Sequence, residues 1–475
     1  MAAPEGPLVV GVDSSTQSTK ALIVDAATGQ VIAQGQARHT VTPDHESDPR
    51  LWWDSLRDAL EQCGPYARQA SAVSVAGQQH GLVTLDRNGQ PVRPALLWND
   101  VRSAPQRDRL IERLGGPKAW AERIGSVPSP SFTAPKWAWL SEHEPEAARA
   151  TAAVRLPHDY LTERLTGAAV TDRGDASGTG WWASSTQRYD EGVLELIGLD
   201  PTLLPRVLGH GEAAGTVRDL PGLPLPRGAL VATGTGDNMA AALGLGLRPG
   251  QPVLSLGTSG TVYAVSRHRP TDPTGTVAGF ADARDAWLPL ACTLNCTLAV
   301  DRIAALLGLD REAVEPGGAT VLFPFLDGER TPHLPYASGL LYGLRHHTSG
   351  GQVLQAAYDG AVFALLRALN LVLDGDSDPD APLVLIGGGA KGTAWRETVR
   401  RLSGRPVRVP RARQLAALGA AAQAAGLLLG EDPAGVARRW GTDIGPSYAA
   451  VPRDEAALGR LEEALTGADA LLRPR

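Results

Sequence analysis

The sequence has only three cysteines and no long apolar run. Cys63, Cys292 and Cys296 are too few for a disulfide framework and do not form a four-ligand zinc pattern. We interpret them as buried free thiols, although the spacing of Cys292 and Cys296 would allow them to share one helix face. No apolar segment reaches the roughly 20 residues that cross a bilayer, and the N-terminus lacks the basic region and apolar core of a secretory signal. We therefore expect a protein of the reducing cytoplasm with no membrane partner.

The sequence also lacks any excess of positive charge. Its net charge is −6 and no basic cluster stands out, which argues against nonspecific binding of nucleic acid. A hydrophobic content of 43% with 20% charged residues is typical of a soluble globular protein. Because 475 residues exceed one ordinary core, we expect two domains of about 200 to 240 residues each.

Apolar periodicity and turn residues predict the same mixture of strands and helices in both halves. In the first half, strands are predicted at 8–13, 20–25, 30–37 and 71–76, a helix at 49–63, a hairpin from 82–85 to 92, mostly helix over 104–170, and a loop at 171–182 ordered by Asp172 and Asp175. In the second half, strands are predicted up to about 290 and at 383–386, with helices around 296–307, at 353–373 and, buried, at 412–429. The boundary is predicted near Gly246, which divides the chain into domains 1–246 and 247–475.

Two similar segments, one in each half, have the composition of phosphate-binding turns. VVGVDSSTQSTKALIVD begins at Val9 and VLSLGTSGTVYAVS begins at Val253, and each predicts a strand, a turn of small hydroxylated residues and a second strand. Such turns leave backbone N–H groups open to an anion. Only the first turn carries a carboxylate, Asp13, where the second has Gly257. The pair therefore predicts a duplicated fold that binds a polyphosphate, with a metal or water ligand on one side only.

Asp237, in GTGDNMAAALG, lies where a predicted strand ends and a helix begins. A carboxylate at this point can accept the proton of a hydroxyl that attacks phosphorus. Asp is equally favoured there as the N-cap of the helix. The phosphate turn that begins shortly afterwards favours the catalytic interpretation.

The motifs GVDSSTQSTK, SVAGQQHG, PALLWND, FTAPKWAWL, PHDYLTERLTG, GTGDNMAAALG, LSLGTSGT, FPFLDGERTPH and LIGGGAKGTAWR occur in one order along nearly the whole chain. In this order and rough spacing they resemble the FGGY carbohydrate kinases, and among these most closely the members that phosphorylate xylulose. The resemblance implies an α/β fold of two actin-like, ribonuclease-H-like ATPase domains that flank a central cleft. It places the sugar mainly on the first domain and ATP mainly on the second.

The resemblance also implies roles for individual residues. Asp237 matches the catalytic base, and Asp13 matches the carboxylate that organises Mg²⁺ and the γ-phosphate. The matching nucleotide residues are Ser14, Ser15, Thr16 and Lys20 in the first turn, Gly257, Thr258, Ser259 and Gly260 in the second, and Gly387, Gly388, Gly389 and Ala390 beside the adenosine. The predicted sugar contacts are Gln79, His80, Asp237 and Asn238, with Trp98 and Asp100 as further candidates.

The sequence departs from the family pattern at the sugar and nucleotide sites. Gln79 stands where xylulose-phosphorylating members commonly have Met, and the first turn reads Asp-Ser-Ser-Thr where many relatives have Asp-Leu-Gly-Thr. We expect an ATP-dependent kinase acting on D-xylulose, with another ketose or polyol (ribulose, a deoxy-ketose) as the alternative substrate. Two alternatives belong to different functional classes. Asp237 argues against a catalytically silent sugar sensor, and the His80–Asn238 pair argues against an actin-like filament or chaperone ATPase. A homodimer is compatible with the resemblance.

Overall fold

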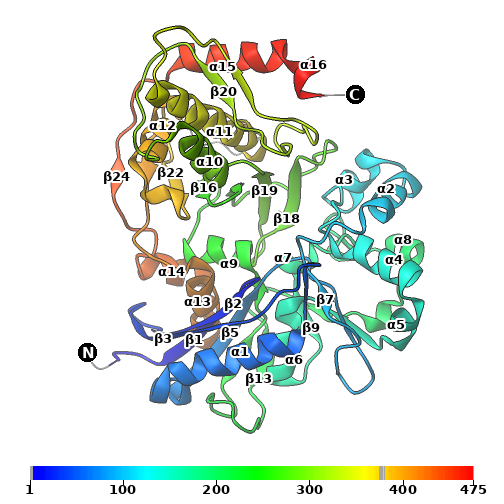
Figure 1. Cartoon of the computed structure of the whole chain (residues 1–475). Helices are drawn as coiled ribbons and strands as arrows, with labels where there is room; N and C mark the ends of the chain where they lie inside the picture. The colour runs from blue at the N-terminus through cyan, green and yellow to red at the C-terminus, as the bar shows by residue number, and fades with distance from the viewer. Residues whose placement is uncertain (1–3, 374–377, 379, 474–475) are drawn as a thin grey trace.

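The computed structural model describes residues 4–373, 378 and 380–473, and within these residues two seven-stranded sheets form the frame (Figure 1). The first sheet has the order β13-β14-β5-β1-β2-β3, and β15 pairs with the end of β5. Its strands are β1 (Leu8–Ser14), β2 (Ser18–Asp25), β3 (Val31–Arg38), β5 (Ala70–Gly77), β13 (Ala213–Thr216), β14 (Leu230–Ala232) and β15 (Thr235–Gly236). These bounds confirm the predicted strands of the first 80 residues.

The second sheet has the order β18-β19-β17-β16-β22-β23-β24. Its strands are β16 (Pro252–Leu256), β17 (Gly260–Ala264), β18 (Val277–Ala281), β19 (Trp287–Thr293), β22 (Leu383–Ile386), β23 (Val407–Arg408) and β24 (Ser447–Tyr448). In both sheets an antiparallel strand pair, β1–β2 or β16–β17, lies beside a parallel neighbour, β5 or β22. The same strand arrangement therefore occurs twice, as the two similar turn segments predict.

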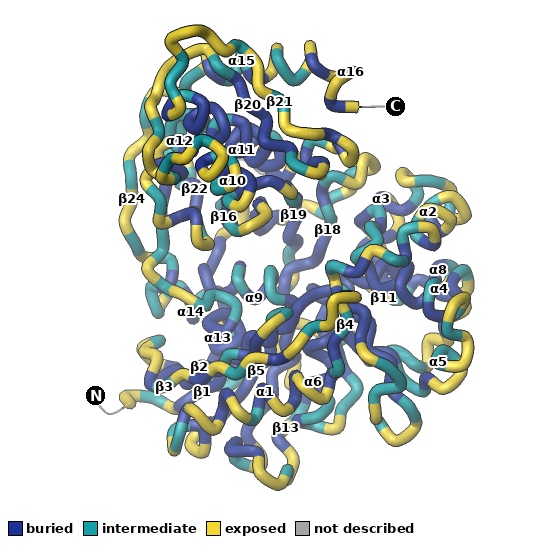
Figure 2. The backbone as a smooth tube through the Cα atoms, in the orientation of Figure 1, coloured by how far each residue is buried: buried dark blue, intermediate teal, exposed yellow. Residues whose placement is uncertain are grey.

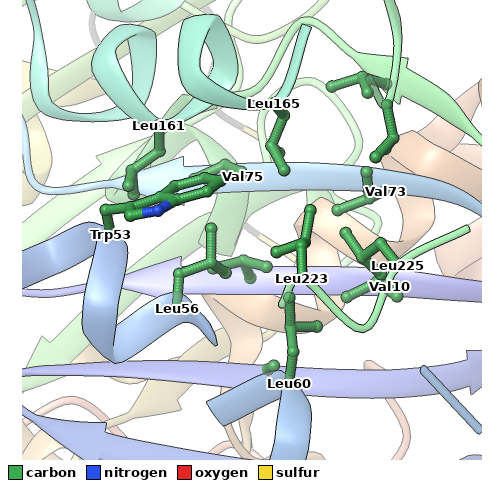
Figure 3. Close-up of a cluster of buried hydrophobic side chains, with 14 of the residues drawn as sticks. Val10, Trp53, Leu56, Leu60, Val73, Val75, Leu161, Leu165, Leu223 and Leu225 are labelled. Carbon is green, nitrogen blue, oxygen red and sulfur yellow. The ribbon is translucent and has the colours of Figure 1, made fainter. Parts of the chain in front are cut away.

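Helices α1 (Pro49–Gln62) and α6 (Pro157–Thr166) pack on one face of the first sheet. Helix α1 begins where the Asp48 side chain accepts the N–H of Arg50 and Pro49 occupies the first turn, and Leu56 and Leu60 point into the core. Figure 3 shows Leu56 and Leu60 together with Val10, Val73, Val75, Leu161 and Leu165 in this layer. The second sheet has a corresponding outer layer, formed by α10 (Thr297–Leu307), α11 (Gly350–Val372), α12 (Thr393–Ser403) and α15 (Glu455–Gly467).

Three helices, α9 (Asp237–Gly244), α13 (Leu415–Leu429) and α14 (Pro433–Arg439), lie between the two halves (Figure 1). Ala417 and Ala421 of α13 pack on Val9 of the first sheet, whereas Leu243 of α9 packs on the second sheet. Figure 2 shows this region as mostly buried backbone. Helix α13 confirms the predicted buried helix. It packs on the first sheet, although its residues belong to the predicted second domain, 247–475. The division into 1–246 and 247–475 stays a prediction.

The remaining segments of the first half form a helical lobe and small strand pairs. The lobe contains α2 (Ala104–Arg113), α3 (Pro117–Arg123), α4 (Thr133–His143), α5 (Pro145–Ala150) and α8 (Glu191–Ile197), around a core that includes Trp120 and Trp137. The two-stranded pairs are β4 (Glu46–Ser47) with β7 (Ala95–Leu96), β6 (Val83–Leu85) with β8 (Ala153–Arg155), β9 (Val170–Asp172) with β12 (Arg206–Leu208), β10 (Trp182–Ala183) with β11 (Arg188–Tyr189), and, in the second half, β20 (Val321–Phe323) with β21 (Leu340–Tyr342). Short helical turns are η1 (Gly64–Gln69), η2 (Pro201–Leu203), η3 (Gly389–Lys391) and α16 (Asp469–Leu472).

The structure corrects one local prediction and tests two others. Residues 171–182 are not a plain loop, because β9 ends there at Asp172 and helix α7 (Arg173–Ala176) follows. The predicted hairpin forms, with an antiparallel bridge between Leu85 and Pro91 and a hydrogen bond from Val92 N to Thr84 O, and β6 also pairs with β8. Cys292 lies in β19 and Cys296 precedes α10, so they share no helix face. All three cysteines are free thiols as predicted, but only Cys63 and Cys296 are buried, and Cys292 is half-buried. Among the described residues, no helix has both the length and the apolar character that crossing a membrane requires.

The close approach of α9 and α13 predicts that Gly419 tolerates no side chain. A Cβ on Gly419 would overlap the backbone carbonyl oxygen of Ala240 in α9. Gly419→Ala is therefore expected to lower the free energy of unfolding by about 1–3 kcal/mol, measured by urea unfolding. Gly459→Ala, at an exposed position of α15 with no atom near the added Cβ, is the control and is expected to stabilise by about 0.5–1 kcal/mol. Equal effects of the two changes would contradict the close packing.

Candidate active site

Three parallel neighbours of the first sheet end at one edge, and each end carries predicted site residues. Asp13 and Ser14 of β1 lie opposite Ala76 and Gly77 of β5, and Gly77 also lies opposite Gly236 of β15. Gln79 and His80 follow β5, and Asp237 follows β15. Because the carboxyl ends of parallel strands meet at the same edge, the fold brings the predicted base, metal carboxylate and sugar residues together.

Asp237 is the first residue of α9, and its carboxylate faces other acids. Its Oδ1 accepts hydrogen bonds from the backbone N (2.8 Å) and Nδ2 (3.0 Å) of Asn238. Burial raises the pKa of Asp237 to about 7, with the negative charges of Asp13 and Asp175 adding to the rise. The N-cap of α9 is Gly236. The alternative that Asp237 is itself the helix cap is therefore wrong.

Asp13 is buried at the end of β1 and anchors the first turn. Its Oδ2 lies 3.2 Å from Lys20 Nζ, and its Oδ1 accepts a 2.7 Å hydrogen bond from Ser15 Oγ. Thr16 Oγ1 accepts a hydrogen bond from Trp98 Nε1 (2.9 Å), so this half-exposed indole lies beside the phosphate turn. The described residues contain no cluster of three side chains that could hold a metal ion. A single carboxylate fits Mg²⁺, which prefers oxygen ligands and completes its shell with water and phosphate.

Gln79 is hydrogen-bonded to Asn238, the residue that follows the candidate base. Its Oε1 accepts a 2.9 Å hydrogen bond from Asn238 Nδ2. Its Nε2 is buried and has no hydrogen-bond partner among the described residues. A buried unpaired donor costs free energy, so this amide nitrogen is suited to a ligand hydroxyl.

His80 has a left-handed backbone (φ 65°) that is held by a buried lysine. Lys136 Nζ donates to the carbonyl oxygens of His80 (2.9 Å) and Ser131 (2.6 Å). The ring Nδ1 lies 2.7 Å from the carbonyl oxygen of Gly178, so Nδ1 carries the proton and Nε2 is free to accept. Burial lowers the pKa of His80 to about 3, and the positive charge of Lys136 contributes, so the ring is neutral.

The second half contributes its own pair of adjacent turns. β16 and β22 are parallel neighbours, and the turns that follow them begin at Gly257 and Gly387. Thr297, the first residue of α10, donates its backbone N (3.1 Å) and Oγ1 (2.8 Å) to the carbonyl oxygen of Gly257. Thr258 and Ser259 are exposed, Gly387 has φ 85°, and no atom lies near a Cβ placed on Gly388. The predicted nucleotide residues of this half therefore lie at one edge of the second sheet, and Gly260 and Ala390 are the buried ends of their turns.

Some predicted residues have other partners in the structure. The Asp100 carboxylate is buried and bonded to Arg102, through its backbone N (2.9 Å) and its Nε (2.7 Å). Asp172 does order its own segment by accepting N–H groups of α7, but Asp175 bonds His158 of α6 instead. A cavity of about 870 Å³ lies in the second half, next to Lys391–Thr393 and Gln355, and none of the predicted site residues lines it.

The sequence analysis assigned no role to the residues that surround His80 from both halves. Phe132 stacks on the imidazole ring (4.9 Å between centroids), and Phe280 of β18 in the second half lies 5.6 Å from it. The positive charge of Arg330, in the motif FPFLDGERTPH, also acts on His80. The motif indicated that this segment matters, but no local pattern places it opposite a residue 250 positions earlier.

Comparisons with known proteins agree with the motifs. The N-terminal and C-terminal domain models of the FGGY family of carbohydrate kinases match residues 8–244 and 253–427. Xylulose kinases of Streptomyces coelicolor and Streptomyces rubiginosus are each 74% identical over 474 residues, covering 99% of this chain and 98% of theirs. The crystal structure of xylulose kinase from Bifidobacterium adolescentis is 36% identical and superposes with a TM-score of 0.88 over 97% of this chain and 99% of that chain. This similarity over both halves confirms the predicted two-domain α/β fold.

Proposed function

Because the chain belongs to the FGGY family of carbohydrate kinases, we propose that it transfers the γ-phosphoryl group of ATP to the terminal hydroxyl of D-xylulose, giving D-xylulose 5-phosphate. The 74% identity to two xylulose kinases over nearly the full chain is the observation that carries this proposal. Family membership itself makes the protein an ATP-dependent carbohydrate kinase that uses a divalent metal ion. We propose Mg²⁺ as that ion and the cytoplasm as the location.

In the proposed mechanism Asp237 is the general base. Its carboxylate accepts the proton of the sugar hydroxyl as the hydroxyl oxygen attacks the γ-phosphorus, and ADP leaves. Asn238 donates two hydrogen bonds to the same Oδ1, which leaves Oδ2 for the substrate proton. A pKa of about 7 suits this role, because the group is ionised near neutral pH and still basic enough to take the proton.

Phosphate binding is proposed for the two turns. The first turn supplies the hydroxyls of Ser14, Ser15 and Thr16 with the Lys20 ammonium, and the second supplies Thr258 and Ser259. Asp13 would hold the divalent ion, which neutralises the charge of the phosphate oxygens when bound. The neighbouring turn at Gly387–Ala390 is proposed to lie against the adenosine, because Gly388 is exposed and no atom lies near a Cβ placed on it.

Sugar binding is proposed for Gln79, His80 and Asn238. The free Nε2 of Gln79 is the donor, and the neutral His80 ring offers Nε2 as an acceptor, so both can bond sugar hydroxyls. Trp98 and Asp100 stay further candidates for sugar contact, but each already has a partner in the protein: Trp98 is bonded to Thr16 in the first turn, and Asp100 is bonded to Arg102.

ADP release measured over a panel of pentuloses and polyols tests the function. D-xylulose is expected to give the highest kcat/KM, with D-ribulose, deoxy-ketoses and polyols lower. A higher kcat/KM for another sugar would make that sugar the substrate in place of D-xylulose. If none of the sugars in the panel gave ADP release, the assignment as a sugar kinase would be contradicted.

Asp237→Asn is expected to lower kcat for D-xylulose by about 10² to 10⁴, because the amide cannot accept the hydroxyl proton. The thermal unfolding midpoint should change little, since Asn keeps the shape of the side chain. Asp219→Asn, at an exposed position, serves as the matched control and should keep full turnover. An Asp237→Asn enzyme within a few-fold of wild type would rule out the general-base role.

The pH dependence of kcat/KM should reflect the ionisation of Asp237. The base works only when deprotonated, and its pKa is raised to about 7. Activity is therefore expected to be constant above this pH and to fall as pH decreases through it, approaching about tenfold per pH unit. Initial rates at low D-xylulose concentration give this profile. A flat profile down to about pH 5.5 would be inconsistent with the assigned base.

Gln79→Met is expected to raise KM for D-xylulose by about tenfold, with a smaller change in kcat, because one hydrogen bond to the bound sugar is lost. Gln69→Met, at an exposed position in η1, is the control. Steady-state kinetics on both variants provide the comparison. If KM stays at the wild-type value, Gln79 does not bond the sugar.

A further inference from the structure

His158 lies fully buried among three carboxylates behind the candidate active site. Its Nδ1 is 2.8 Å from Asp175 Oδ2, and its Nε2 is 3.2 Å from Asp159 Oδ1 and 3.7 Å from Asp172 Oδ1. The three acids come from different elements, Asp159 from α6, Asp172 from the end of β9 and Asp175 from α7. The other oxygen of Asp175 has no hydrogen-bond donor among the described residues, so the imidazole is the main partner of that carboxylate.

The surroundings favour the charged form of the ring. Burial alone lowers the pKa of His158, but the charge of Asp159, together with the hydrogen bond and charge of Asp175, raises it to about 9. One buried positive charge thus faces three acids. Burial raises the pKa of Asp159, and it raises that of Asp175 to about 7, whereas the charge of His158 opposes both rises. The imidazolium therefore helps to keep these buried acids ionised.

The His158 cluster is physically connected to the strand that carries Asp237. Asp172 Oδ2 accepts a 2.6 Å hydrogen bond from Thr235 Oγ1, and Thr235 lies two residues before Asp237. The His158 ring also fills the space beside this strand, because its Cδ2 lies 2.8 Å from a Cβ placed on Gly234. On the other side, its backbone N lies 2.9 Å from a Cβ placed on Gly77, just before Gln79.

The cluster also acts on Asp237 through charge. The groups that face Asp237 are Asp13 from β1, Asp175 from α7 and Tyr263 from β17, with Asn238 on its own helix. Asp175 is the member shared by both sets, since it bonds His158 and its negative charge is felt at Asp237.

We propose that His158, as an imidazolium, is a positioning residue for the general base: it neutralises the acids packed behind Asp237 and, through Asp172 and Thr235, fixes the strand that presents it. This role rests on the proposed function, because it concerns the same base. Among the described residues, the ionic and hydrogen-bond partners of the His158 ring are Asp159, Asp172 and Asp175. It therefore acts on the base through these acids and Thr235, and through its packing beside Gly234 and Gly77.

Two substitutions at His158 separate charge from shape. His158→Gln removes the charge, and its effect on kcat/KM is measured against pH with D-xylulose. The acid limb of this profile is the range in which kcat/KM falls as pH decreases. Its midpoint is expected to move up by about one pH unit, which is the effect of a unit charge a few side chains away at an effective dielectric constant of about 20. His158→Lys keeps a cation in the cluster and is expected to return the limb towards the wild-type position.

Asp175→Asn gives the opposite sign and keeps the proposal testable if His158→Gln folds poorly. It removes a negative charge near Asp237, so the acid limb is expected to move to lower pH. His39→Gln, the loss of a buried histidine that forms no ion pair among the described residues, is the control and should leave the limb in place. A merely structural cluster would instead lower activity at all pH values in every variant.

The outcomes distinguish this role from the function itself. Limbs that stay at the wild-type pH in folded His158→Gln and Asp175→Asn enzymes, or that move in the same direction, would overturn the role of His158. A wild-type enzyme that phosphorylates no sugar of the panel would instead contradict the proposed function. Opposite shifts with partial return in His158→Lys would support the proposal.

Discussion

The contact between the backbones of α9 and α13 sets the spacing of the two sheets. Helix α13 packs on the first sheet and α9 on the second, and the two helices touch where Gly419 meets Ala240. Gly244 and Gly11 allow the same close approach to α13 at either side. Since Asp237 opens α9, this contact also fixes the candidate base relative to both halves. Because the base follows β15 of the first sheet, a change in the spacing would move it relative to the turns of the second sheet even if each sheet kept its own structure.

Buried charge is the second constraint on the site. Burial and neighbouring acids raise the pKa of Asp237. The negative charge of these neighbouring acids is compensated by two cations, Lys20 beside Asp13 and His158 beside Asp175. With acids alone, the carboxylates would take up protons and lose the charge that metal binding and base catalysis need. The observed arrangement keeps them separated, each with its own partner, around the end of one sheet.

The sequence predicts those features that depend on local pattern. Asp13 and Asp237 are predicted from strand-and-turn patterns and Gln79 from the family resemblance, and the parallel ladder then places the strand ends together. The burial of α13 follows from a composition that is almost entirely alanine, leucine and glycine. Helix α7 was missed because four residues are too few to show a helical period.

Contacts between distant segments account for the other differences. Asp175 bonds His158, Trp98 bonds Thr16 and Phe280 meets His80, and each pair is formed by tertiary packing that no local spacing encodes. The family resemblance could not supply them, since it assigns roles only at matching motifs. The roles of the candidate residues in binding and catalysis stay predictions, whereas their placement at shared strand ends is observed.

The position of α13 has a consequence for folding during synthesis. The strands of the first sheet are complete once β15 ends at Gly236, but one face of that sheet is covered only by a helix that begins at Leu415. A nascent chain therefore exposes Val9, Leu22 and Ala72 to solvent until most of the second half has left the ribosome. At about 5–20 residues per second this interval lasts on the order of ten seconds or more. The N-terminal half is thus the part of the nascent chain on which a chaperone that binds apolar strands would act.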